Sequence, residues 1–129
     1  KQIISFLKKQ KKVKEILYPY NPSSKNYKLW KKYYSGATGL LSIVIKSKKK
    51  SSVIKFVNSL ELFGIGYSWG GFESLAILQE LRSNKKDEYL QGRKYFRFNK
   101  DEHIVRLHIG LEDPKDLIND LKKSLRYIK

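Results

Sequence analysis

The stretch IVRLHIGLEDPKDLINDLKKSL, Ile104 to Leu125, joins an apolar segment directly to a segment with helix signals. Its first seven residues are rich in β-branched and leucine side chains, which predicts a strand. Asp113 is suited to cap a helix and Pro114 to open one. Apolar residues then follow at helical spacing: Leu117, Ile118, Leu121, Leu125 and Ile128. A strand that runs into an amphipathic helix favours a sheet covered by helices.

The rest of the chain alternates strand and helix patterns irregularly. Strands are predicted at VKEILYP (Val13–Pro19), GLLSIVIKS (Gly39–Ser47), ELFGIGY (Glu61–Tyr67) and KYFRF (Lys94–Phe98), the last forming a hairpin with HIVRLHIGLE through residues 99–102. ESLAIL (Glu73–Leu78) is another short apolar run. Helices are predicted at residues 1–10, from Ser23 or Ser24 to Tyr34, and along Val53, Phe56, Val57 and Leu60. Residues 79–91 are polar and predict a loop with some helix. The sequence therefore predicts an α+β fold, with a mixed or antiparallel sheet of about four strands covered by helices.

Length and composition limit the classes of protein to consider. The 129 residues suit a single domain, and the absence of cysteine excludes disulfide frameworks and thiolate metal sites. No apolar run reaches the ~20 residues that span a bilayer. The sequence contains no methionine and begins Lys1-Gln2-Ile3, so we expect a fragment of a longer polypeptide.

The net charge of +16 raises the alternative of a small basic nucleic-acid-binding module. Lysine supplies 23 of the 28 cationic side chains, although base and phosphate recognition favours the planar fork of arginine. The lysines are also dispersed, in clusters at residues 8–14, 25–32, 46–50 and 85–94. We therefore expect weak duplex binding without sequence preference, and no specific nucleic acid as a partner.

A glycine-rich stretch separates two apolar runs: FGIGYSWGGFESLAIL, Phe63 to Leu78. Four glycines within eight residues indicate a backbone bent close to another segment or to a ligand. The stretch is not a dinucleotide fingerprint, because Trp69 stands where the third glycine is needed. Taken alone, Ser68 fits a turn residue and Trp69 fits a core packing residue.

The titratable residues of the predicted last strand offer no complete active site. His103 and His108 are five residues apart, so they project to opposite sheet faces and cannot chelate one metal. Glu112 and Asp113 are better explained as helix capping. Arg106 lies among apolar residues and must either pair with a carboxylate, such as Glu102 or Asp87, or act as an anion receptor.

These stretches resemble the C-terminal portion of the Cys/Met-metabolism family of pyridoxal-phosphate enzymes, and within it the cystathionine β-lyase branch. The resemblance rests on FGIGYSWGGFESLA followed by IVRLHIGLEDPKDLINDLKKSL, and extends to KVKEILYP and to NPSSKNYKLWKKYYSGATGLLSIVI. It implies the small C-terminal domain of a fold type I enzyme. Residues 1–129 would form one domain, with the end of the interdomain helix and the first strand in residues 1–17 and the core in residues 35–129.

The resemblance also assigns residue roles. Ser68 and Arg106 would bind the α-carboxylate of the substrate, and Trp69 would border the same pocket. We expect Ser68 and Arg106 to meet because the strand ELFGIGY, which leads into the glycine turn, would pair with the interior strand that carries Arg106. Gly70 and Gly71 would let the backbone turn beneath the ligand, and Glu73 would anchor the loop. The activity implied is cleavage of a carbon–sulfur bond in a sulfur amino acid such as cystathionine, within methionine biosynthesis and transsulfuration.

The family holds its cofactor in a large N-terminal domain, as a Schiff base on a lysine that follows serine and threonine residues. The lysine of SSKNY, Lys25, corresponds to a surface segment and not to that lysine. The resemblance therefore implies that this chain binds no pyridoxal phosphate covalently and is inactive alone. The partners implied are the missing cofactor domain and, in the full enzyme, further copies in a cytoplasmic dimer or tetramer.

Overall fold

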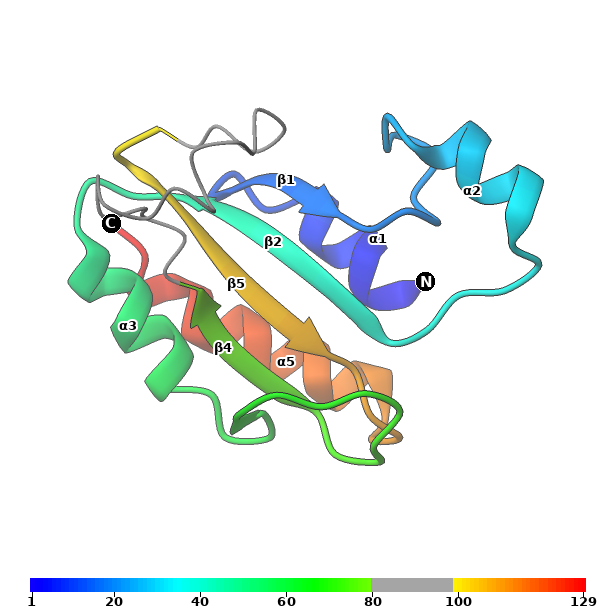
Figure 1. The fold of residues 1–129 in the computed structure, drawn as a ribbon. Helices are drawn as coiled ribbons and strands as arrows, with labels where there is room; N and C mark the ends of the chain where they lie inside the picture. The colour runs from blue at the N-terminus through cyan, green and yellow to red at the C-terminus, as the bar shows by residue number, and fades with distance from the viewer. Residues whose placement is uncertain (80–98) are drawn as a thin grey trace, which may run out of the picture.

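Residues 1–79 and 99–129 are described by a computed structural model. Five strands form one sheet in the order β1-β2-β5-β4-β3 (Figure 1). They are β1 Val13–Leu17, β2 Leu40–Lys46, β3 Gly64–Ile65, β4 Leu75–Gln79 and β5 Glu102–His108. The β3–β4 pair is parallel and the other three pairs are antiparallel. The α+β class with a mixed sheet is confirmed, and the described sheet has five strands where about four were predicted.

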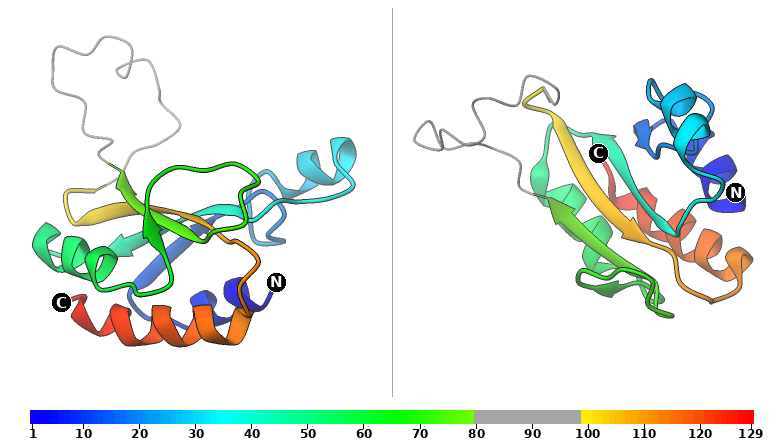
Figure 2. Two further views of the ribbon diagram at one scale, coloured as in Figure 1. Left: turned by 90° about the horizontal axis from the view of Figure 1, so that it is seen from below. Right: turned by 45° about the vertical axis from the view of Figure 1, so that its right-hand side comes forward.

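Helices cover one face of this sheet. They are α1 Gln2–Lys8, α3 Lys50–Asn58 and α5 Pro114–Ser124, the last followed by the 3-10 turn η1 Leu125–Tyr127. Figure 2 shows all three helices beneath the sheet. The remaining helix, α2 Tyr27–Tyr33, lies beyond one end of the sheet and buries none of its residues. Among the helices of the described ranges, none is long and apolar enough to cross a membrane.

The core lies between the sheet and these helices. Alternate strand residues point to this side, including the fully buried Ile43 and Ile45 of β2 and Val105 and Leu107 of β5. They pack in one cluster with Val53 and Phe56 of α3 and Leu117 and Leu121 of α5. Because these helical residues recur at three- and four-residue spacing, they form the stripes that the sequence predicted.

The opposite face of the sheet carries Arg106. In the register of the sheet, Arg106 lies between Ser42 of β2 and Ile77 of β4, so all three side chains share that face. The chain between β3 and β4, residues 66–74, crosses this side of the sheet (Figure 2), and we call it the loop face.

Helix starts were predicted with mixed success. The Asp113 side chain accepts a hydrogen bond from the Lys115 N–H at 2.7 Å, and Pro114 opens α5, as predicted. The predicted cap of α2 at Ser23 or Ser24 is wrong. The N-cap is Asn26, and the Ser24 hydroxyl instead accepts the Asn26 N–H at 3.3 Å, which closes a turn before the helix.

Two sequence predictions fall on residues that are not described. The predicted strand 94–98, with its hairpin to β5, lies outside the described residues, as do residues 80–91 of the predicted loop. Among the described strands, β5 is flanked by β2 and β4. Arg106 therefore sits on an interior strand, as expected.

Candidate functional site

The glycine-rich loop, residues 66–74, is held at both ends by backbone hydrogen bonds. Gly64 N–H donates to the Ser74 carbonyl at 3.0 Å, which closes the base of the loop. Leu111 N–H donates to the Phe72 carbonyl at 2.9 Å, which ties the loop to the segment after β5. The loop was expected to adjoin β5 through a neighbouring strand, and that expectation is wrong. β4 lies between β3 and β5, so the loop reaches β5 by crossing over β4.

Arg106 is the central side chain beneath this loop. Its Nη2 donates to the Ser68 carbonyl at 3.0 Å, and its guanidinium carbon lies 5.1 Å from the centre of the Tyr67 ring. The side chain is half-buried and has no carboxylate partner in the part of the chain that the structure describes. The alternative partner Glu102 pairs with Lys14, and Asp87 lies outside the described residues. Arg106 and the Ser68 loop thus meet on one face, joined through the Ser68 backbone.

The turn from Ser68 to Gly71 depends on its glycines. Gly70 has a φ of +66°, a left-handed conformation that suits the third position of a tight turn. A Cβ on Gly71 would lie 2.6 Å from the Ser68 hydroxyl oxygen, so the Ser68 side chain folds over Gly71. The Ser68 hydroxyl is therefore inside the turn, while its carbonyl faces Arg106.

The carboxylate that anchors the loop is Glu112. It accepts the Ser74 N–H at 2.8 Å and the Ser74 hydroxyl at 2.7 Å. Desolvation raises the pKa of the Glu112 carboxyl, but the two Ser74 hydrogen bonds and the nearby His108 outweigh it, so the pKa is lowered. Glu73, expected to be the anchor, is exposed and makes no recorded hydrogen bond with a described residue. The residue one position beyond it, Ser74, faces inward instead, because side chains alternate along the segment entering β4.

Large apolar side chains are exposed along the loop. Trp69 is 84% exposed and lies at the tip of the turn, which rules out the alternative of a core residue. Tyr67, Phe72 and Leu111 are also exposed. Trp69 is therefore available to a ligand or to another polypeptide beside Arg106.

The two histidines occupy opposite faces, as predicted. His103 lies on the helix side and bonds the Ser47 carbonyl through Nε2 at 3.1 Å. His108 lies on the loop face and bonds the Gly71 carbonyl through Nε2 at 3.0 Å. Both side chains are buried, so they are structural residues of the strand and not surface ones.

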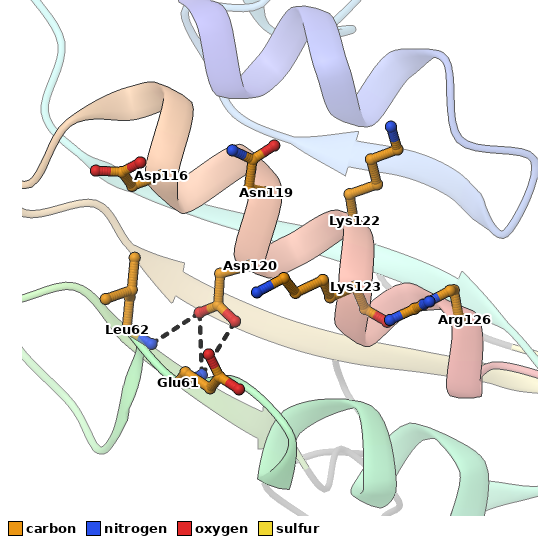
Figure 3. A pocket seen from close by; sticks show the side chains of 8 residues that line it. All are labelled: Glu61, Leu62, Asp116, Asn119, Asp120, Lys122, Lys123 and Arg126. Atoms are coloured by element: carbon orange, nitrogen blue, oxygen red, sulfur yellow. Dashed lines mark hydrogen bonds between the residues drawn. The ribbon is translucent and has the colours of Figure 1, made fainter.

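A separate hollow lies on the helix side, between α5 and the segment after α3 (Figure 3). It is lined by Glu61, Leu62, Asp116, Asn119, Asp120, Lys122, Lys123 and Arg126. The Asp120 carboxylate already accepts the N–H groups of Glu61 and Leu62, and the remaining charges are of both signs. None of the residues singled out from the sequence as a site lines this hollow.

Two of the lysine clusters lie at opposite ends of the sheet (Figure 1). One surrounds α2, and the other spans the connection from β2 to α3. A duplex-binding surface requires cations on one contiguous face, and this separation weighs against the nucleic-acid alternative.

The fold and the loop face define an α+β domain that presents a half-buried arginine, unneutralised by any described carboxylate, beneath a glycine turn. The chain belongs to the Cys/Met metabolism PLP-dependent enzyme family, whose model matches residues 1–126. The family depends on pyridoxal phosphate.

Individual relatives agree with this assignment. A cystathionine beta-lyase of Bordetella avium is 38% identical over 124 residues, covering 96% of this chain and 29% of that protein. An L-alanine/L-glutamate racemase of Wolbachia pipientis is 34% identical, covering 96% of this chain and 29% of that protein. The crystal structure of the Campylobacter jejuni metY protein, which carries a pyridoxyl-lysine group, matches with a TM-score of 0.70 and 28% identity over 97% of this chain and 26% of its own. The chain therefore spans less than a third of the length of each of these relatives.

Sequence reasoning missed three residues of this surface. Ser74 and Glu112 were not linked, and Tyr67 was not considered as a partner of Arg106. The signal for Glu112 was present, because Asp113 alone satisfies the helix cap and leaves its neighbour without a role. No sequence signal could have linked Tyr67 to Arg106, because their contact depends on the path of the loop.

Proposed function

We propose that this chain is the small C-terminal domain of a pyridoxal-phosphate carbon–sulfur lyase of the cystathionine β-lyase type, and that it recognises the α-carboxylate of a sulfur amino acid. The observation that carries the proposal is Arg106, a half-buried guanidinium on the loop face without a carboxylate partner among the described residues. The domain assignment is supported by the family match and by the names of several relatives.

The chemistry of Arg106 favours a carboxylate ligand. A guanidinium has five N–H donors, and a carboxylate can accept two of them side by side. One donor is engaged by the Ser68 carbonyl, which is a neutral acceptor and leaves the positive charge unneutralised. The centre of the Tyr67 ring lies 5.1 Å from the guanidinium carbon, a cation–π contact that leaves the remaining N–H donors for an anion.

The neighbouring loop residues complete this surface. Ser68 positions the guanidinium through its carbonyl, and its hydroxyl becomes available to the carboxylate if the side chain rotates away from Gly71. Trp69, exposed at the tip of the turn, borders the substrate and excludes water from the Arg106 contact. Gly70 and Gly71 permit the turn that brings both residues to this edge.

Pyridoxal phosphate, when bound in the complete enzyme, acts as an electron sink for chemistry at the substrate α-carbon. The donors on the loop face fit a carboxylate, and the residues of this chain bind and orient that group. The lysine context that would hold the cofactor is not found at Lys25, which is exposed before α2. We therefore propose that the chain by itself carries no covalent cofactor and has no lyase activity.

The test uses a chimera in which this chain replaces the matching segment of the Bordetella avium relative. Arg106→Ala should reduce kcat/KM for cystathionine strongly, by about 3–5 kcal/mol in transition-state terms, because it leaves a buried carboxylate unpaired. Arg126→Ala is the matched control, since Arg126 is exposed on η1 and bonds the Lys123 carbonyl. An Arg106→Ala chimera that keeps wild-type kcat/KM would refute the carboxylate role.

A further inference from the structure

Arg106 and His108 lie on the same face of β5, two residues apart, and each holds one carbonyl of the turn above them. Arg106 Nη2 is 3.0 Å from the Ser68 carbonyl oxygen, and His108 Nε2 is 3.0 Å from the Gly71 carbonyl oxygen. These two carbonyls belong to the first and last residues of the four-residue turn. The turn is therefore fixed to the strand at both ends by side chains of that strand.

The His108 contact defines the protonation of its ring. A carbonyl oxygen accepts hydrogen bonds and cannot donate them, so Nε2 carries the proton. His108 is 4% exposed, and its Nδ1 has no hydrogen-bond partner among the described residues. The Gly71 contact therefore requires a proton on Nε2.

Arg106 and His108 differ in the other hydrogen bonds that are open to them. If Arg106 binds a substrate carboxylate, part of its donor capacity is directed away from the turn. His108 is buried and cannot reach a ligand outside the turn, so its only recorded donor stays on Gly71. The turn gains little from packing, because Trp69 is exposed and Gly70 and Gly71 have no side chains. During binding, His108 is the side chain that keeps the turn in register with Arg106.

We propose that His108 is a positioning residue for the carboxylate site: its Nε2–H fixes the Gly71 carbonyl, and thereby the height of the Ser68–Gly71 turn above Arg106. This inference rests on the proposed function of Arg106 and adds to it a residue that does not touch substrate. The role requires one donor at one place, so a side chain that supplies the same donor replaces His108.

The chain offers a matched set of variants. In His108→Gln, the amide nitrogen lies as many bonds from Cα as histidine Nε2 and can donate to Gly71, whereas in His108→Asn it falls one bond short. In the chimera, His108→Asn should raise KM for cystathionine about tenfold with kcat within twofold, because the lost contact acts on ground-state and transition-state binding alike. His108→Gln should stay within about threefold of wild type. His103→Asn, on the opposite face of β5, is the control and should leave KM unchanged.

A second measurement on the 129-residue chain separates this inference from the proposed function. Ring ¹⁵N shifts should report a protonated Nε2 for His108. Backbone relaxation should report a more mobile Trp69–Gly71 segment in His108→Asn and wild-type order in His108→Gln. An Nε2 without a proton, or unchanged turn order and KM in His108→Asn, overturns the inference. An Arg106→Ala chimera with full activity refutes the carboxylate site while leaving the His108–turn contact testable by NMR.

Discussion

The carboxylate of Glu112 accepts two hydrogen bonds from Ser74, one from the backbone N–H at 2.8 Å and one from the hydroxyl at 2.7 Å. The Ser74 hydroxyl oxygen also accepts the Gly110 N–H at 2.9 Å. Ser74 is 1% exposed, so these bonds are formed out of water. They join the start of β4 to the segment after β5, directly behind the glycine turn, and so support the loop from the side that no ligand would reach.

Ser74→Ala should therefore destabilise the fold. The change removes one hydrogen bond to a charged group and leaves the Gly110 N–H without its acceptor, a loss of about 1–3 kcal/mol in the free energy of unfolding. Urea unfolding measures this loss. Ser51→Ala is the control, because Ser51 is exposed on α3 and has no recorded side-chain hydrogen bond with a described residue. Equal midpoints for the two variants would show that the Glu112 contact contributes nothing.

Asp120 has a comparable structural role on the other side of the sheet, where it anchors a loop through backbone hydrogen bonds (Figure 3). Its buried carboxylate accepts the Glu61 N–H at 3.0 Å and the Leu62 N–H at 2.8 Å, which fixes the segment between α3 and β3. Asp120→Ala leaves both donors unpaired and should lower the free energy of unfolding by about 2–3 kcal/mol. Asp116→Ala, exposed one turn earlier on α5, should cost about 0.3–1 kcal/mol through the helix dipole alone. Similar losses in the two variants would contradict the structural role of Asp120.

Local sequence signals were enough to predict most of the elements. The β-branched run of β2, the apolar stripes of α3 and α5 and the Asp113 cap are decided by nearest neighbours and by period, so they could be found without the structure. The N-cap of α2 could not be predicted, because Ser23, Ser24 and Asn26 are all suitable capping residues. The turn that the Ser24 hydroxyl closes with the Asn26 N–H determines that the helix begins after Asn26.

The residues of the candidate site could be predicted from the sequence, but the way the fold brings them together could not. Arg106 and the glycine turn were identified from their unusual sequence context, and the family resemblance assigned Ser68, Trp69 and Arg106 to one carboxylate site. Their meeting was expected through adjacent strands, whereas it results from a loop crossing over β4. The Ser74–Glu112 anchor joins residues 38 positions apart, and a contact of that sequence separation leaves no periodic signal.

Glu102 should make the stability of the fold depend on acid. Its pKa is lowered from 4.5 to about 2, first by the hydrogen bond from Lys14 and then by the backbone and side-chain N–H groups of Asn99. Because the folded-state pKa is the lower one, this stabilisation is present above pH 4.5 and is lost as the pH falls toward 2. Glu102→Gln should flatten the decline in unfolding midpoint between pH 4.5 and pH 2.

The control for this measurement is Glu15→Gln, because Glu15 is exposed on β1 and has no recorded hydrogen bond with a described residue. Its decline in midpoint should match that of the wild type. If Glu102→Gln shows the wild-type decline as well, the Lys14 and Asn99 contacts do not hold the ionised form in solution.

The two glycines of the turn should respond differently to alanine. Gly70 has open space around it, but its φ of +66° is strained for a side chain, so Gly70→Ala should cost about 1–2 kcal/mol in stability.

A Cβ on Gly71 meets the Ser68 hydroxyl at 2.6 Å, and that hydroxyl can rotate away. Gly71→Ala should therefore preserve the unfolding midpoint and act on the orientation of Ser68, which is measured as a changed KM in the chimera. Gly36→Ala is the reference, because no atom lies within 4 Å of its Cβ position and its φ is not left-handed, so it should be neutral or stabilising by up to about 1 kcal/mol. A Gly71→Ala chimera with wild-type KM would mean that the Ser68 hydroxyl does not contribute to substrate binding, and the carboxylate would then rest on Arg106 alone.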